Sequence, residues 1–371
     1  MRVGVPKEIK VQEHRVGLTP MAVREYTHAG HEVLVQGGAG AGIGADDAAY
    51  VAAGARIVAT AAEVFAAAEM IVKVKEPQPG EWKMLREGQI LFTYLHLAPD
   101  PEQARGLLDS GCIAVAYETV TDERGGLPLL APMSEVAGRL AIEAAAFALR
   151  KPAGGKGLLM GGVPGVPPAR VAVVGGGVVG THAARMAVGL GAEVIILDRS
   201  LPRLRQLDEL FQGRARTRFS SVATIEEEVL AADVVVGAVL VPGASAPRVV
   251  TREMLKRMRP RSVLVDVAID QGGCFETSRA TTHDAPTYEV DGIIHYCVAN
   301  MPGAVPATSS HALNHATLPF GLALAEHGGR ALVVDPHLRC GLNIHRGRVT
   351  CAPVAHALGL PFVAAEVALG M

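Results

Sequence analysis

One glycine-rich stretch constrains the fold more than any other part of this 371-residue chain. An apolar, β-branched run at residues 171–174 is followed by glycines spaced as G-x-G-x-x-G, namely Gly175, Gly177 and Gly180. A helix-period pattern comes next, and a second apolar run occupies residues 194–197. A strand, a tight glycine turn, a helix and a second strand in this order are typical of a dinucleotide-binding βαβ unit.

Each glycine of this turn has its own steric reason. Gly175 allows the tight turn out of the strand, and Gly177 has no side chain to keep a pyrophosphate away from the backbone. Gly180 lets the helix pack closely on the sheet. The helix N-terminus adds free N–H groups and a positive dipole end, so the stretch predicts a phosphate-binding site.

An acidic residue specifies the kind of dinucleotide. Asp198 ends the second apolar run, and its separation from the turn is close to the usual value of about 20 residues. Its carboxylate would accept hydrogen bonds from the adenosine ribose and repel a 2′-phosphate, which favours NAD over NADP. Arg199 weakens this preference. The alternative is a glycine-rich βαβ turn that binds no ligand.

A second glycine-rich segment, GGAGAGIG at residues 37–44, also follows an apolar run. It fits only the looser pattern G-x-G-x-x-A, and Asp46 and Asp47 come directly after it, where they would repel an anionic ligand. We therefore predict a flexible loop and a helix start here.

Composition limits the class of protein. Hydrophobic residues make up 49% of the chain and charged residues 19%, which is typical of a soluble globular protein with two or three domains. A formal net charge of −2 argues against nucleic acid or a membrane surface as the main partner. The five cysteines form no CxxC pair, and the N-terminus has no apolar signal segment, so we expect a reducing, cytoplasmic location without a zinc site.

Apolar runs alternate with helical patterns over residues 1–128. This alternation predicts a parallel α/β sheet that is covered on both faces. The predicted strands lie at 3–5, 32–35, 70–74, 90–93 and 113–116, and the predicted helices at 21–29, 46–53, 61–67 and 102–108.

The rest of the chain contains the dinucleotide-binding region. Ser134 is predicted to cap a long alanine-rich helix that ends near residue 149, and residues 154–168 are too rich in glycine and proline for anything but a loop. A helix is predicted at 309–326. His311 and His315 lie on one face of it, but the sequence lacks the glutamate of a zinc protease motif, so no metal site is predicted.

Four polar residues follow predicted strands and could carry chemistry. Arg15 could hold a carboxylate through its planar guanidinium, although taken alone a solvated surface charge is the stronger interpretation. Lys75 could bind a ligand or simply extend to solvent. His96 could transfer protons near neutral pH or be a satisfied core residue. Asp270 should lie outside the carboxyl end of a strand, near a nicotinamide.

Several motifs together resemble the alanine dehydrogenase and transhydrogenase alpha-subunit family, and they extend over nearly the whole chain. The stretches that carry the resemblance are GVPKEIK, EHRVGLTP, VKVKEP, YLHLAPD, PMSEVAGR, GGGVVG, VDVAIDQGGCFE and YCVANMPGAVP. The resemblance implies two Rossmann-like domains with parallel sheets that flank a cleft. Residues 1–128 and 306–371 would form the substrate domain, and residues 129–305 the NAD-binding domain.

The resemblance also implies an activity, which is NAD-dependent oxidative deamination of L-alanine to pyruvate and ammonia, together with the reverse reaction. Arg15 and Lys75 would hold the pyruvate carboxylate and carbonyl, His96 would be the acid/base, and Asp270 would assist at the reacting carbon. The residues implied to line the cofactor, besides the glycines, are Ser134, Asp198, Ser220, Val239, Asp270, Asn300 and Met301. A homo-oligomer, commonly a hexamer, is implied as well.

Some members of that family carry a metal on the helix after Pro319, but here Ala323 stands where an acidic ligand is wanted. Three other interpretations stay open. The first is an NAD-binding module of a transhydrogenase, and the second is a non-catalytic NAD sensor on the same fold. The third is a related amino-acid dehydrogenase with a larger side-chain pocket.

Overall fold

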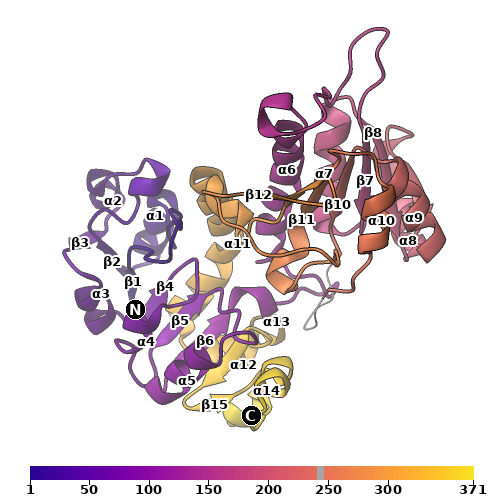
Figure 1. Cartoon of the computed structure of the whole chain (residues 1–371). Coiled ribbons are helices and arrows are strands. Elements are labelled where there is room, and N and C mark those ends of the chain that lie inside the picture. The colour runs from indigo at the N-terminus through magenta and orange to yellow at the C-terminus, as the bar shows by residue number, and fades with distance from the viewer. Residues whose placement is uncertain (240–245) are drawn as a thin grey trace. The chain divides into compact units, whose positions relative to one another are not determined.

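The computed structural model describes residues 1–239 and 246–371. The chain forms two compact units, and the first contains both ends of the chain (Figure 1). Unit 1 comprises Met1–Met133 and Val305–Met371, and unit 2 comprises Ser134–Ala304. Among the helices within the described ranges, none combines the length and the apolar character that crossing a membrane requires.

Unit 1 is organised around an eight-stranded sheet in the order β15-β14-β6-β5-β4-β1-β2-β3. Its strands are β1 Arg2–Val5, β2 Glu32–Gln36, β3 Arg56–Val58, β4 Met70–Val72, β5 Ile90–Thr93, β6 Ile113–Ala116, β14 Leu342–His345 and β15 Arg348–Val349. The first six strands are parallel, as predicted, and the short β3 is an edge strand that the apolar pattern missed. β14 pairs antiparallel with β6, so the C-terminal segment completes this sheet.

Local capping explains where the helices of unit 1 begin. Thr19 caps the first helix, Asp46 accepts a hydrogen bond from the N–H of Ala49, and Thr60 forms a capping box with Glu63. The predicted helix start after the second glycine-rich segment is thereby confirmed. The helical segments are α1 Pro20–His28, η1 Ala41–Ile43, α2 Asp47–Ala52, α3 Ala61–Ala67, α4 Pro79–Trp82, α5 Pro101–Ser110, η2 Tyr117–Thr119, α11 Pro306–His327, α12 Arg330–Val334, α13 Pro336–Arg339, α14 Ala352–Leu358 and α15 Ala365–Ala368.

Unit 2 contains a seven-stranded sheet in the order β12-β13-β11-β10-β7-β8-β9. The strands are β7 Arg170–Val174, β8 Glu193–Asp198, β9 Arg216–Phe219, β10 Val234–Gly237, β11 Val263–Asp266, β12 Thr287–Val290 and β13 Ile293–Tyr296. All pairings are parallel except that of β12 with β13. The chain runs outward from β7 in one direction and from β10 in the other, so the strand order reverses between them, which is where open α/β sheets bind ligands.

Both faces of this second sheet are covered by helices. Along β7, Val171 and Val173 belong to one buried cluster, and Ala172 and Val174 belong to another on the opposite face. This alternation explains why the strand reads as a continuous apolar run. The helical segments that begin in or next to this unit are α6 Ala131–Ala148, η3 Lys151–Ala153, α7 Val178–Gly189, α8 Leu201–Phe211, α9 Val222–Ala231, α10 Arg252–Arg257, η4 Val267–Gln271 and η5 Met301–Ala304.

The prediction that Ser134 caps the long helix is wrong. Helix α6 already begins at Ala131, and Ser134 lies within it. The carbonyl of Leu127 accepts hydrogen bonds from the N–H groups of Leu130 and Ala131, so the preceding turn leads directly into the helix. Pro132 is tolerated in the first turn because its missing N–H has no intrahelical partner there.

Candidate functional site

The glycine turn of unit 2 is shaped by close backbone contacts at two of its three positions. Gly175 has φ +105°, and a Cβ there would lie 2.4 Å from the carbonyl oxygen of Ala238. A Cβ on Gly180 would lie 1.8 Å from the carbonyl oxygen of Gly175. Gly177, at the N-terminus of α7, differs, because a Cβ there would meet no heavy atom of the described residues within 4 Å. Of the three motif glycines, Gly177 alone has open space where its Cβ would be, within the described residues. A pyrophosphate could occupy that space, so the turn fits a phosphate-binding site.

This difference gives a testable prediction with a built-in control. We expect Gly177→Ala to leave the thermal unfolding midpoint unchanged and to weaken dinucleotide binding by roughly tenfold or more, because the methyl group occupies space needed by the phosphates. We expect Gly180→Ala to lower the unfolding midpoint, because its methyl group overlaps the backbone of Gly175. Calorimetric melting and a fluorescence titration with NADH measure both effects. A destabilised Gly177→Ala with normal NADH affinity would contradict this assignment.

Asp198 connects the end of β8 to the glycine turn. Its Oδ2 accepts the N–H of Gly176 at 2.7 Å, and its Oδ1 accepts the N–H of Ser200 at 2.8 Å. Arg203 supports the same turn by donating from Nε to the Gly176 carbonyl at 2.7 Å and from Nη2 to Thr181 Oγ1 at 2.7 Å. The half-buried carboxylate is thus held in place and keeps acceptor capacity for a ribose. Sequence reasoning missed the supporting role of Arg203.

The other predicted cofactor residues of unit 2, apart from Ser134, follow the carboxyl ends of its strands. Ser220 is buried after β9, and its N–H donates to the Asp198 carbonyl at 2.9 Å. Val239 is half-buried after β10. Asn300, with φ +61°, and the buried Met301 follow β13 at the start of η5. These residues therefore share the edge of the sheet at which the glycine turn lies.

Ser134 reaches this region from a helix instead. One turn further along α6, a Cβ on Gly138 would lie 2.3 Å from the carbonyl oxygen of Val179. Helix α6 therefore packs directly against the first turn of α7, and half-buried Ser134 precedes that contact by one turn.

Asp270 lies in η4, just beyond β11, and its side chain is exposed. The residue that organises this loop is Asp266, which sequence reasoning did not select. Asp266 is fully buried and accepts hydrogen bonds from the N–H groups of Ala268 at 3.0 Å and Cys274 at 2.8 Å, and from the Ser278 hydroxyl. Burial raises the pKa of Asp266, and these hydrogen bonds only partly offset the rise. The stretch VDVAID at residues 265–270 contains both aspartates, and its pattern alone does not distinguish their roles.

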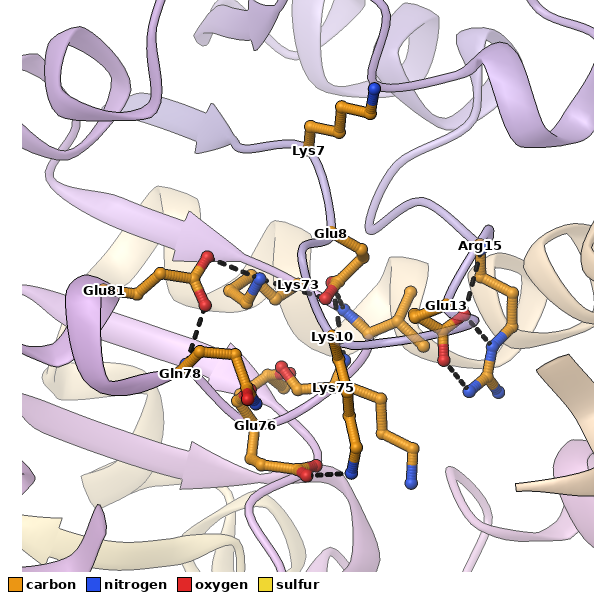
Figure 2. Close-up of polar contacts among 12 residues, drawn as sticks. Lys7, Glu8, Lys10, Glu13, Arg15, Lys73, Lys75, Glu76, Gln78 and Glu81 are labelled. Atoms are coloured by element: carbon orange, nitrogen blue, oxygen red, sulfur yellow. Dashed lines mark hydrogen bonds and ion pairs between the residues drawn. The ribbon is translucent and has the colours of Figure 1, made fainter. Parts of the chain in front are cut away.

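In unit 1, Arg15 is buried and its orientation is fixed. Its Nε and Nη2 donate to the two carboxylate oxygens of Glu13 at 2.7 and 2.5 Å, and its Nη1 lies 3.1 Å from Met133 Sδ (Figure 2 shows the Glu13 pair). Burial alone would lower the pKa of Arg15, but the hydrogen bonds and charge of Glu13 outweigh it and raise the pKa. The interpretation of Arg15 as a solvated surface charge is therefore wrong, because its side chain is only 1% exposed.

Lys75 follows β4 and lies next to a buried ionic cluster. Glu8, Lys73 and Glu81 form this cluster, in which Lys73 Nζ donates to Glu8 Oε2 at 3.0 Å and to Glu81 Oε1 at 2.8 Å (Figure 2). The other oxygen of Glu8 accepts the N–H of Val74 at 2.6 Å and that of Lys75 at 3.4 Å. The backbone that leads into Lys75 is therefore fixed by a carboxylate from the loop after β1. Sequence reasoning missed this cluster.

His96 follows β5 in an uncommon backbone conformation. Its φ is +48°, in the left-handed region, and its N–H donates to Glu118 Oε1 at 2.6 Å. Its half-buried ring stacks on Tyr94, with centroids 5.8 Å apart and planes 12° from parallel. The imidazole is thus supported on one face by an aromatic side chain.

Arg15, Lys75 and His96 belong to one edge of unit 1. They follow β1, β4 and β5, which are neighbouring parallel strands, and their loops all leave the carboxyl end of the sheet. The pKa of Glu76 reports on the charges there. Burial raises it, but the charges of Lys75, Lys10 and His96 and the hydrogen bond from Lys10 lower it overall. This edge therefore offers cations for a carboxylate and a carbonyl, and an imidazole for proton transfer.

Comparisons with known proteins agree along the full chain. Residues 4–137 match the family model for the N-terminal domain of alanine dehydrogenase/PNT, and residues 141–352 match that for the C-terminal domain. The chain is 58% identical over its whole length to the complete alanine dehydrogenase of Halomonas elongata. It is 54% identical to that of Bacillus subtilis, with 100% of this chain and 98% of the relative covered.

Solved structures show the same relationship. An L-alanine dehydrogenase structure superimposes with a TM-score of 0.93 and 50% identity over 97% of this chain and 99% of that chain. A transhydrogenase from Sinorhizobium meliloti gives a TM-score of 0.80 and 28% identity over 95% and 99% of the two chains. The predicted resemblance and fold class are thereby confirmed, and the chain belongs to the alanine dehydrogenase/PNT family.

Proposed function

We propose that this chain is an NAD-dependent L-alanine dehydrogenase, which converts L-alanine to pyruvate and ammonia and catalyses the reverse reductive amination. The observation that carries the proposal is the arrangement of Arg15, Lys75 and His96 at one edge of unit 1, in a chain whose full-length relatives bear that name. A small 2-oxo acid needs a cation for its carboxylate, a donor for its carbonyl and an acid/base near neutral pH, and these three residues supply them.

In this proposal unit 1 binds the substrate and unit 2 binds NAD. Arg15 and Lys75 hold the carboxylate and the carbonyl or imine end of the substrate, and the rigid Glu13–Arg15 pair fixes the orientation of the guanidinium. NAD supplies the hydride acceptor. His96 takes a proton from the water that adds to the imine and returns a proton to the departing ammonia. Asp270 assists at the reacting carbon.

The cofactor would be held by residues of unit 2. The glycine turn binds the pyrophosphate, and Asp198 binds the adenosine ribose and disfavours a 2′-phosphate. The other residues that line the dinucleotide in this proposal are Ser134, Ser220, Val239, Asp270, Asn300 and Met301. We further propose that the protein is a cytoplasmic homo-oligomer, namely a hexamer. Light scattering after size-exclusion chromatography would measure the mass of this oligomer.

The assay that tests the function follows nicotinamide absorbance with purified protein, NADH, ammonium and pyruvate. We expect ammonium-dependent loss of NADH with pyruvate and little with NADPH. Glyoxylate and longer 2-oxo acids are tested in parallel, because a larger side-chain pocket would move activity to a longer acid. NADH binding without turnover of any acid would reject the dehydrogenase and favour a transhydrogenase-like module, consistent with the likeness to the Sinorhizobium meliloti structure.

A further inference from the structure

The turn that carries His96 is held by side chains from two other elements. The N–H of Leu95 lies 3.1 and 3.2 Å from the two carboxylate oxygens of Glu118, and the N–H of His96 donates to Glu118 Oε1 at 2.6 Å. Gln103, which is completely buried on α5, donates from Nε2 to the Leu95 carbonyl at 3.0 Å. Tyr94 is anchored by its hydroxyl, which donates to the Leu129 carbonyl at 2.6 Å. These contacts leave the turn little freedom to change conformation.

The backbone of His96 needs such support. Its φ of +48° lies in the left-handed region, which is disfavoured for a residue with a side chain relative to the right-handed region. Because φ sets the direction of the Cα–Cβ bond, a return to negative φ would swing the imidazole away. The hydrogen bond to the N–H of His96 is charge-assisted and short, so Glu118 acts directly on the strained residue.

Glu118 is itself well fixed for this purpose. It lies in η2, directly after β6, and β6 pairs with β5 in register through Thr93 and Ala116. Within residues 1–239 and 246–371, no Lys or Arg side chain comes within ion-pair distance of its carboxylate. Its two oxygens instead accept backbone N–H groups of the turn that contains His96, the proposed acid/base.

We propose that Glu118 is a positioning residue for the reaction: by accepting the N–H groups of Leu95 and His96, it holds His96 in the left-handed conformation that aims the imidazole at the substrate. This inference rests on the proposed function, because it assigns Glu118 to the acid/base of that reaction. Glu118 does not touch substrate, and it acts only through His96.

The test compares three variants of the full-length protein in the alanine assay. Glu118→Ala removes both acceptor oxygens, whereas Glu118→Gln keeps one acceptor oxygen of the same reach. Asp122→Ala is the matched control, because the Asp122 carboxylate also accepts two backbone N–H groups of a turn, those of Arg124 at 2.9 Å and Gly126 at 2.7 Å, without any link to His96. For each variant kcat, the KM for alanine and NAD, and the thermal unfolding midpoint are measured.

We expect Glu118→Ala to lower kcat by about 10²-fold with the KM for NAD unchanged, since misplacement of a catalytic group by about 1 Å has an effect of that size. Glu118→Gln should recover most of kcat, and Asp122→Ala should retain it. A kcat within threefold of wild type for Glu118→Ala, or equal losses for the Ala and Gln variants, would overturn the proposal. If Glu118→Ala does not fold, Glu118→Asp takes its place, and a normal kcat for that shortened side chain would overturn the proposal as well.

A crystal structure of Glu118→Ala separates this inference from the proposed function. A shift of His96 to negative φ supports the positioning role even if the wild-type protein oxidises no alanine. An unchanged positive φ at His96 in that structure would overturn the positioning role even if the wild-type protein is an active alanine dehydrogenase.

Discussion

We expect His96→Ala to abolish measurable alanine oxidation and to leave NADH binding intact. The imidazole is the proposed proton donor and acceptor for addition of water to the imine and for release of ammonia, and loss of a general acid/base lowers kcat by roughly 10²–10⁴-fold. The glycine turn and Asp198, which we propose bind the dinucleotide, belong to unit 2, whereas His96 belongs to unit 1. Steady-state rates and a fluorescence titration with NADH measure the two parts of this prediction.

His28→Ala is the control for the histidine substitution. His28 is exposed at the end of α1 and belongs to the same unit, so its replacement should change neither rate nor affinity. Near-normal turnover by His96→Ala would reject the acid/base assignment. A parallel loss of NADH affinity would mean that His96 acts on the cofactor rather than on protons.

Much of the fold follows from local patterns in the sequence. The G-x-G-x-x-G motif predicted β7, α7 and β8 correctly, because two of its glycines are required by nearby backbone. Gly180 packs on the carbonyl of Gly175 in the same turn, and Gly175 packs on the carbonyl of Ala238 after the neighbouring strand. The buried parallel strands also read directly from their apolar runs. The antiparallel pairing of β14 with β6 could not be predicted, because it joins segments more than two hundred residues apart. The helix start was wrongly predicted at Ser134 because the hydrogen-bonded backbone turn at Leu127, and not a side-chain cap, decides where the helix begins.

The candidate site was predicted only in part. Lys75 and His96 stand directly after apolar runs, and Arg15 lies in the loop that follows the run at 3–5. Parallel strands bring their carboxyl ends to one edge, so sequence position indicates that the three residues lie together. The groups that orient them carry no local signal. Glu118 contacts His96 from η2, which follows the neighbouring strand β6. Glu13 is recognisable as a partner of Arg15 only once both side chains are known to be buried. Long polar side chains in a sequence are ordinarily solvated, and their burial depends on the tertiary fold.

The cluster of Glu8, Lys73 and Glu81 shows how much such hidden groups matter. It joins the loop after β1, the end of β4 and the first turn of α4, where Glu81 also accepts the N–H of Gln78 at 2.8 Å. Lys73 is fully buried, and its charge opposes the rise that burial causes in the pKa of Glu8. A single ammonium group therefore links three segments, among them the loop that carries Arg15 and the end of β4 that leads to Lys75.

Lys73→Met should destabilise the protein by about 3–5 kcal/mol at pH 8, because it leaves two carboxylates buried without a cation.

Burial already raises the pKa of Glu8, and loss of Lys73 raises it further. A carboxyl group with a raised pKa in the folded state stabilises that state below its ordinary pKa and loses this contribution as pH rises through the raised value. The destabilisation should therefore be smaller at pH 5 than at pH 8, as denaturant unfolding of variant and wild type at both values would show. The control Glu8→Gln/Lys73→Met/Glu81→Gln leaves no charged group in this cluster, so its stability relative to wild type should change less with pH. A loss below about 1 kcal/mol for Lys73→Met at pH 8 would mean that water or rearrangement satisfies the two carboxylates and that the cluster does not fix these loops.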